Sequence, residues 1–163
     1  MSEGALRNSP TFFGRESFEE LTEAARANTR RRQNFDFHDA ASHPAQRLLN
    51  AVEPDSYIRP HRHLEPRKDE TFVVLRGAFG LVLFDDDGSV MDARVLRAGG
   101  DLVGAHVPGG MFHCLVSLAQ GSVFFEAKAG PYNVAIDKDW PSWAPPEGAS
   151  DAPAYLERLR ALF

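Results

Sequence analysis

Two histidines one residue apart are the side chains of this sequence whose types and spacing best suit chemistry. His61 and His63 flank Arg62, and in an extended strand, where successive side chains alternate between faces, the two imidazoles point the same way. Two imidazoles held side by side can bind one transition metal ion, and Glu70 and His113 can complete its ligand set from neighbouring strands. The sequence therefore predicts a metal centre inside a small β-barrel.

The spacing of these residues resembles that of the cupin superfamily. The first cupin motif is matched by His61-x-His63, Glu70 and Gly77, and the second by Pro108-x-Gly110-x-x-His113. Six residues separate His63 from Glu70, whereas cupins usually have three or four. We therefore expect a longer loop before the strand that carries Glu70.

Within the cupins, the chain is similar to the WbuC-type cupin-fold metalloproteins from about Arg31 to about Gly148. The runs that carry this resemblance are Gln46-Arg47-Leu48-Leu49, Ser56-Tyr57-Ile58-Arg59-Pro60-His61-Arg62-His63, Glu126-Ala127-Lys128-Ala129-Gly130-Pro131-Tyr132 and Trp143-Ala144-Pro145. The resemblance implies an all-β fold, the cupin double-stranded β-helix or jelly-roll barrel, with a short N-terminal helix and a short C-terminal helix. It also implies one divalent transition metal ion (Fe, Mn, Ni, Co, Zn or Cu) and a homodimer formed through edge strands.

Turn and periodicity signals divide the chain into three parts. An N-terminal arm and a helix packed on the barrel occupy residues 1–34, the barrel 35–132, and a Pro- and Trp-rich loop with a C-terminal helix 133–163. Ser17-Phe18-Glu19-Glu20 has the pattern of a capping box, with Ser17 at the N-cap and Glu20 at N3, so the first helix is expected to run to about Arg30. The run Arg30-Arg31-Arg32 is then a cationic helix end facing the macrodipole, or a contact for an anionic ligand or partner subunit.

Short β-rich stretches separated by Gly, Pro and Asp turn signals fill the middle of the chain. The predicted strands are 47–52, 57–63, 70–76, 78–84, 90–96, 102–107, 111–116 and 122–129. Gly77 is expected to close a hairpin between 70–76 and 78–84, and the Asp87-Gly88 pair another into 90–96. Many short strands at regular spacing favour a sandwich or barrel. Leu156, Leu159 and Leu162 keep helical spacing in a helix from about Pro153, which is expected to cover one end of the barrel.

Strand alternation predicts which side chains share the cavity with the metal. With Glu70 inward, the same face holds Phe72, Val74 and Arg76, and with His113 inward it holds Met111 and Leu115. Cys114 then points away from the cavity and is expected to be a small core hydrophobe. Phe72, Arg76 and Met111 are therefore candidate ligand-binding residues.

Two further segments can contribute polar groups. Glu126 and Lys128 share a face of the strand 122–129 with Phe124, and they form either a solvated edge with an ion pair or part of the pocket mouth, which the resemblance favours. Tyr57 and Arg59 have the same parity as His61; the Arg59 guanidinium can hold a carboxylate or phosphate. Glu126, Tyr57 and Lys128 are the candidate catalytic residues, with Glu126 or Tyr57 as a general base.

Composition excludes some classes of function. The 163 residues suit one domain, and a net charge of −5 with a pI of about 5.6 argues against a nucleic-acid partner. No apolar run approaches the ~20 residues that span a membrane, and the N-terminus has no signal-peptide pattern. We expect a cytoplasmic protein, and the lone Cys114 fits a reducing compartment.

Three functions fit such a centre. The first is an enzyme acting on a small anionic or sugar-like ligand, either a metal-dependent isomerase or lyase or an iron-dependent dioxygenase. The second is a non-catalytic module that binds or senses a ligand, and the third is a metal that only stabilises the barrel. The WbuC-type resemblance implies a link to surface polysaccharide (O-antigen) biosynthesis.

Overall fold

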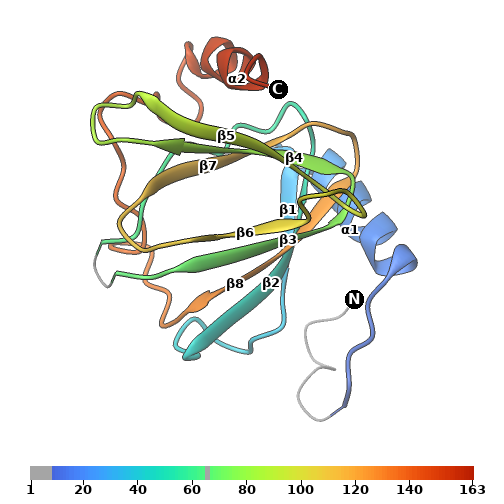
Figure 1. The fold of residues 1–163 in the computed structure, drawn as a ribbon. Coiled ribbons are helices and arrows are strands. Elements are labelled where there is room, and N and C mark those ends of the chain that lie inside the picture. Colours follow the sequence, from blue (N-terminus) through green and yellow to red (C-terminus); the bar gives the residue numbers. More distant parts are fainter. Residues whose placement is uncertain (1–8, 65–66) are drawn as a thin grey trace.

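The computed structural model describes residues 9–64 and 67–163, and in it two sheets face each other (Figure 1). The start of the predicted N-terminal arm, residues 1–8, lies outside the described residues. The helices are α1 (Arg15–Ala27) and α2 (Ala152–Arg160), and the strands are β1 (Arg32–Asp36), β2 (Ala45–Val52), β3 (Glu70–Arg76), β4 (Ala78–Phe84), β5 (Val90–Arg97), β6 (Gly104–Val107), β7 (Phe112–Ser117) and β8 (Ser122–Ala129). No helix of these described ranges is long and apolar enough to span a membrane.

Antiparallel pairing builds both sheets. Five strands follow the order β1-β2-β8-β3-β6, and three follow the order β5-β4-β7. Helix α1 packs against β1 and β2, and α2 packs against β7 (Figure 1). Between the sheets lies an apolar core with members from both, among them Phe72, Val74, Phe79, Leu81, Leu115 and Phe124. The all-β barrel with two short flanking helices is therefore confirmed.

Most of the predicted strands occur within one or two residues of their expected bounds, and β3, β4 and β8 match fully. The predicted strand 57–63 is wrong: this extended segment forms only isolated bridges, His61 to His113 and Arg62 to Asp139. Pro60, which has no N–H to donate, interrupts ladder pairing there. Strand β1 was not predicted, although it pairs along its whole length with β2.

The expected hairpin at Gly77 is also wrong. Strand β3 pairs with β6 and β8, whereas β4 pairs with β5 and β7, so Gly77 carries the chain from one sheet to the other. A one-residue connection is shorter than the two-residue loops that close tight hairpins. Gly77 has φ +73°, and a Cβ there would lie 2.2 Å from Ser122 Oγ.

The N-terminal helix differs from its prediction at both ends. Gly14, and not Ser17, is the N-cap, and Ser17 at N3 accepts a hydrogen bond from the Gly14 N–H at 2.9 Å. The helix ends at Ala27, before the arginine run. Arg30 and Arg32 pair with Glu147, whereas the Arg31 guanidinium donates to the Arg26 carbonyl in the last turn of the helix, so only Arg31 meets the negative end of the macrodipole as predicted.

Candidate metal centre

Three histidines and one glutamate meet at one end of the barrel interior. His61, His63 and Glu70 are buried, and their ligand atoms lie within 4.8 Å of one another. Glu70 begins β3, and its two oxygens lie 3.0 Å from His63 Nε2 and 2.7 Å from Nε2 of His113 on β7. Backbone hydrogen bonds in both directions between His61 and His113 hold the histidine segment against β7.

All three imidazoles present the same nitrogen to this centre. Each Nδ1 lies at a backbone carbonyl oxygen: that of Arg59 for His61 (2.9 Å), Met111 for His113 (2.9 Å) and Asp137 for His63. An Nδ1–H that donates to a carbonyl fixes the tautomer and leaves the Nε2 lone pair free. The arrangement therefore presents three Nε2 acceptors and a carboxylate to one point.

The chemistry of this donor set fits a divalent transition metal. Among residues 9–64 and 67–163, His63 Nε2 is buried and has no hydrogen-bond partner, and a buried unpaired acceptor beside a carboxylate is unfavourable unless a cation lies between them. Burial lowers the pKa of His61 far below its usual value, and nearby Lys138 acts in the same direction, so this imidazole is neutral. Burial acts to raise the pKa of Glu70, but contacts with His113 and His63 hold it well below its usual range. Neutral imidazoles and an ionised carboxylate are the forms that bind such ions.

Lys128 on β8 lies among three carboxylates. Its Nζ is 3.0 Å from Glu126, 3.3 Å from Glu70 and 3.6 Å from Asp137. Burial opposes the charge of this ammonium group, yet the carboxylates, Glu126 first, raise the pKa of Lys128 above its usual value. Burial raises the pKa of Glu126 in turn, and Asn50 Nδ2 donates to its Oε2 at 3.1 Å.

A buried ion pair ties the C-terminal loop to the histidine segment. Lys68 Nζ lies 2.9 Å from Asp137 Oδ1, and both side chains are almost fully buried. The backbone carbonyl of Asp137 accepts the hydrogen bond from His63 Nδ1, and Asp139 exchanges backbone hydrogen bonds with Arg62. One short stretch of the loop therefore positions a candidate ligand.

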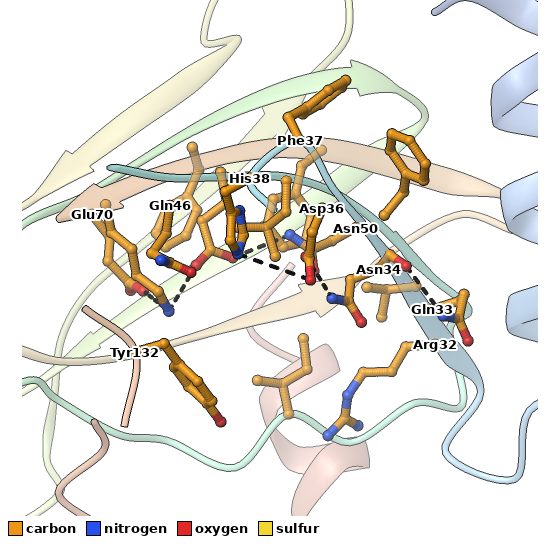
Figure 2. Close-up of a pocket in the computed structure, with 18 of the residues that line it drawn as sticks. Arg32, Gln33, Asn34, Asp36, Phe37, His38, Gln46, Asn50, Glu70 and Tyr132 are labelled. Carbon is orange, nitrogen blue, oxygen red and sulfur yellow. Dashed lines mark hydrogen bonds and ion pairs between the residues drawn. The ribbon is translucent and has the colours of Figure 1, made fainter. Parts of the chain in front are cut away.

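A cavity of about 1460 Å³ opens beside the centre (Figure 2). Its walls come from the inner faces of β1, β2, β3, β7 and β8 and from the segment that carries Lys138 and Trp140. Around the edge strand β1 the cavity also reaches Phe35, Phe37 and helix α1. His61, Glu70 and His113 lie on its wall, so a metal held there would face the cavity. Burial lowers the pKa of Lys138, and the charge of Lys128 acts in the same direction.

Several predicted site residues are brought to this cavity. Phe72, Glu126 and Lys128 line it, and only 8% of Glu126 is exposed, so the solvated-edge interpretation of β8 is wrong. Met111 packs against the apolar core beside the centre and does not line the cavity. Cys114 is fully buried on the opposite face of β7, as the alternation predicted, and burial raises the pKa of its thiol.

Two predicted pocket residues of the histidine segment lie away from the cavity. Tyr57 packs beside Tyr155, donates its hydroxyl to Pro145 O at 3.0 Å, and has its pKa raised by burial, so it cannot serve as a base in the cavity. Arg59 donates to backbone carbonyls of the loop, Pro141 O (2.7 Å) and Ala144 O (3.1 Å). Both predictions assumed a regular strand, which the segment is not.

Arg76 is also directed away from the cavity. A register shift between Val74 and Arg76 breaks the alternation of β3. Arg76 Nε donates to Gly121 O at 2.8 Å, close to α1. A β-bulge of this kind turns the following side chain to the other face.

Sequence reasoning missed other residues of the site. Asn50, Lys138 and Trp140 line the cavity, and Asp137 supports His63. The alternation of β2 could have predicted Asn50, because it shares a face with Gln46. Asp137, Lys138 and Trp140 lie in a loop, where no periodic pattern of side chains could have predicted their positions.

Comparisons with known proteins address the family and the fold. The model of a family described as Domain of unknown function (DUF6016) matches residues 13–96. No curated protein matches this chain. KdgF from Halomonas sp. has a TM-score of 0.49 and 21% identity, over 64% of this chain and 84% of that chain.

Oxalate decarboxylase from Bacillus subtilis is also similar. Its TM-score is 0.51 with 14% identity over 67% of this chain, and the match spans only 27% of the decarboxylase chain. This decarboxylase is a cupin-fold protein. The cupin barrel predicted from the sequence is therefore confirmed as a fold.

Proposed function

The chain belongs to the family of the domain of unknown function DUF6016, and we propose that it is a metal-binding cupin that binds a small anionic ligand beside its metal. One divalent transition metal ion would be held by His61, His63, Glu70 and His113. The observation that carries this proposal is the shared orientation of the three histidines, each with Nδ1 at a backbone carbonyl and Nε2 at the centre.

The charge balance of the cavity supports an anionic ligand. At its inner end the carboxylates of Glu70 and Glu126 are matched by the ammonium groups of Lys128 and Lys138. A divalent ion therefore leaves an excess of two positive charges in a largely buried place, where electrostatic attraction is stronger than in water. A carboxylate or phosphate group of the ligand would offset that excess.

The chain also supplies groups for proton transfer. When bound, a metal of this kind supplies Lewis acidity at an open coordination position. Burial raises the pKa of Glu126, and a raised pKa makes a carboxylate a stronger proton acceptor, as a general base requires. Lys128, 3.0 Å from Glu126, would orient the anionic group and hold this carboxyl in place. We infer that Glu126 and Lys128 act on the ligand, in an isomerase or lyase reaction.

A metal-content measurement tests the central assignment. The protein is purified without a His-tag or chelator and analysed by mass spectrometry beside a His61→Ala/His63→Ala variant, with His106→Ala as the matched control because His106 is exposed. We expect close to one metal ion per chain in the protein and the control, and none in the double variant. Equal metal in all three, or none in any after reconstitution, would overturn the proposal.

The metal found then selects among the remaining functions. Mn(II) is the first candidate, because the structurally similar oxalate decarboxylase from Bacillus subtilis contains Mn(II) centres. Iron would direct the search to oxygen-dependent turnover by a dioxygenase. A ligand that binds equally well to Glu126→Gln and the unchanged protein, without turnover by either, would support the non-catalytic binding or sensing module.

The cupin subtype, the oligomeric state and the cellular location are proposals as well. The motif runs around His61 and Glu126 support a WbuC-type cupin with a place in surface polysaccharide biosynthesis. The free edge strands β1 and β6 of the larger sheet offer a surface for a homodimer. Light scattering tests the dimer. The net charge of −5 supports a protein without a nucleic-acid partner, and the lone Cys114 supports a cytoplasmic location.

A further inference from the structure

A row of polar side chains leads away from the metal centre across the inner face of the larger sheet. Four of them form what we call the polar strip: Glu126 on β8, Asn50 on β2, and Asn34 and Asp36 on β1. In the register of the sheet, Asn34 on β1 pairs with Asn50 on β2. Leu48 on β2 pairs with Asp36 on one side and with Glu126 of β8 on the other, so these three residues lie in one row across the strands. Figure 2 shows Asn34, Asp36 and Asn50 on the cavity wall together with Glu70.

The strip is long compared with a single small anion. Glu70 lies on β3, and β8, β2 and β1 follow in that order. Neighbouring strands lie about 4.8 Å apart, so β1 is roughly 14 Å from the strand that carries the candidate ligand Glu70. The cavity covers this whole distance. A ligand that uses it must therefore extend well beyond the group at the metal.

The polarity of the strip selects hydroxyl groups. Asn50 donates to Glu126 Oε2 at 3.1 Å, and Asn34 donates to Asp36 Oδ1 at 2.9 Å. The amide oxygens remain as acceptors, and the Asp36 carboxylate is an acceptor only. At the β1 end of the cavity the carboxylates of Asp36 and Asp39 lie with Arg30 and Arg32, and both arginines pair with Glu147. Because the arginines are already paired, the two aspartates are the charged groups left to a ligand, which favours neutral hydroxyl donors there over a second anionic group.

An aromatic platform lies on the loop side of the same cavity. Trp140 lines it with 44% of its surface exposed, and its ring centroid lies 5.6 Å from that of His61. Arg59 and Lys138 lie over the Trp140 ring at 5.3 and 5.5 Å, which restrains its orientation. Where these two side chains leave the indole uncovered, it offers an apolar contact in a polar cavity, which suits the C–H groups of a sugar ring, because such a ring has both an apolar face and hydroxyl edges.

We propose that the ligand has two parts, an anionic group at the metal end and a hydroxyl-rich portion of at least one further sugar ring along the polar strip. The ligand class is thus an acidic oligosaccharide with its charge at one end. This inference rests on the proposed function for its anionic end, and it adds the length, the neutral tail and the residues that recognise it.

Calorimetric titration of the metal-loaded protein tests the inference. The probes are glucuronic acid, cellobiouronic acid, which joins glucuronic acid to one neutral glucose, and neutral cellobiose. We expect cellobiouronic acid to bind about tenfold more tightly than glucuronic acid, because its neutral ring adds hydrogen bonds to the polar strip. Cellobiose should bind more weakly than either acid.

A pair of variants identifies the contribution of the strip. In Asn34→Ala/Asp36→Ala the advantage of cellobiouronic acid should disappear while glucuronic acid binds unchanged. The control is Arg47→Ala on the outer face of β2, which does not line the cavity and should retain the advantage. Equal binding of the two acids by the unchanged protein, or an advantage retained in the double variant, would overturn this inference alone. Binding of neither acid despite a full metal site would overturn the proposed function with it.

Discussion

The two ends of the barrel interior are built from the same strands but differ in character. On β3, Glu70 faces the metal centre, and Phe72 and Val74 face the apolar core. On β7, His113 faces the metal centre and Leu115 the apolar core. One end therefore holds buried charges and imidazoles, and the other is filled with aliphatic and aromatic side chains.

The difference shows how a small barrel tolerates a charged interior. Desolvation of buried carboxylates and ammonium groups is costly unless they are paired, and paired groups roughly compensate that cost without a large gain. Glu70, Glu126, Asp137, Lys68 and Lys128 are paired in this way. We therefore expect the apolar end to supply most of the stability and the polar end most of the chemistry.

The largest expected effect is on the apolar side of this comparison. Phe79 is fully buried and packs edge-to-face on Phe124 at 5.0 Å. Phe79→Ala should lower the free energy of unfolding by about 3–5 kcal/mol, because it leaves a cavity in the core. Denaturant titration measures the loss, with the exposed Val90→Ala as control. The folded fraction should still bind metal, and loss of metal from folded protein would contradict the separation of the two ends.

On the polar side, His113→Ala should act on the metal first. We expect metal affinity to fall at least about 100-fold, because mutation of residues that only support a metal ligand already lowers affinity 10–100-fold. Competition with a chromogenic chelator measures the affinity, and His106→Ala serves as the control because its side chain is exposed. Unchanged affinity in His113→Ala would remove His113 from the ligand set.

A smaller effect is expected at the loop that supports His63. Asp137→Asn keeps the backbone carbonyl that accepts from His63 Nδ1 but removes the charge that pairs with Lys68. Metal affinity should fall about 10–100-fold, as for other groups that orient a metal ligand. The exposed Asp55→Asn, on a surface ion pair, is the matched control. An effect no larger than that of the control would show that the pair does not position His63.

The metal-free protein should lose stability in mild acid. The pKa of His61 is well below 6.5 in the folded state, so the unfolded chain takes up a proton there that the folded chain does not. Stability should therefore fall as the pH drops below about 6.5, the usual pKa of a histidine in an unfolded chain. The lowered pKa of Glu70 adds a loss of the same sign only at more acid pH, below about 4.5.

Melting temperatures in EDTA at pH 7.5 and 5.5 measure the His61 effect. The difference should shrink in His61→Gln and persist in His106→Ala. An equal pH dependence in all three proteins would mean that His61 is protonated in the folded state.

The smallest effect is expected at Cys114. Its thiol is fully buried on the core face of β7, and burial raises its pKa. The folded protein should not react with a thiol reagent at neutral pH, and the urea-unfolded protein should react with one equivalent. Rapid labelling of the folded protein would place Cys114 on the cavity side.

Regular strands account for what the sequence predicted well. The alternation of β3 and β7 placed Phe72 and Leu115 on the inner face and Cys114 on the other. On β8 the alternation left the face of Glu126 and Lys128 open, and the structure places both at the cavity. Where the alternation is interrupted the predictions were wrong, at Arg76 after a bulge and at Tyr57 and Arg59 in a segment that only bridges to its neighbours.

The sequence by itself determined the cupin barrel and the residues that can form a metal centre, because motif spacing and strand period are local properties. Only the tertiary structure decided that Gly77 joins two sheets, that β1 supplies Asn34 and Asp36 to the cavity, and that Asp137 supports His63. These contacts join residues far apart in the chain, and such pairings follow from how the sheets and loops pack.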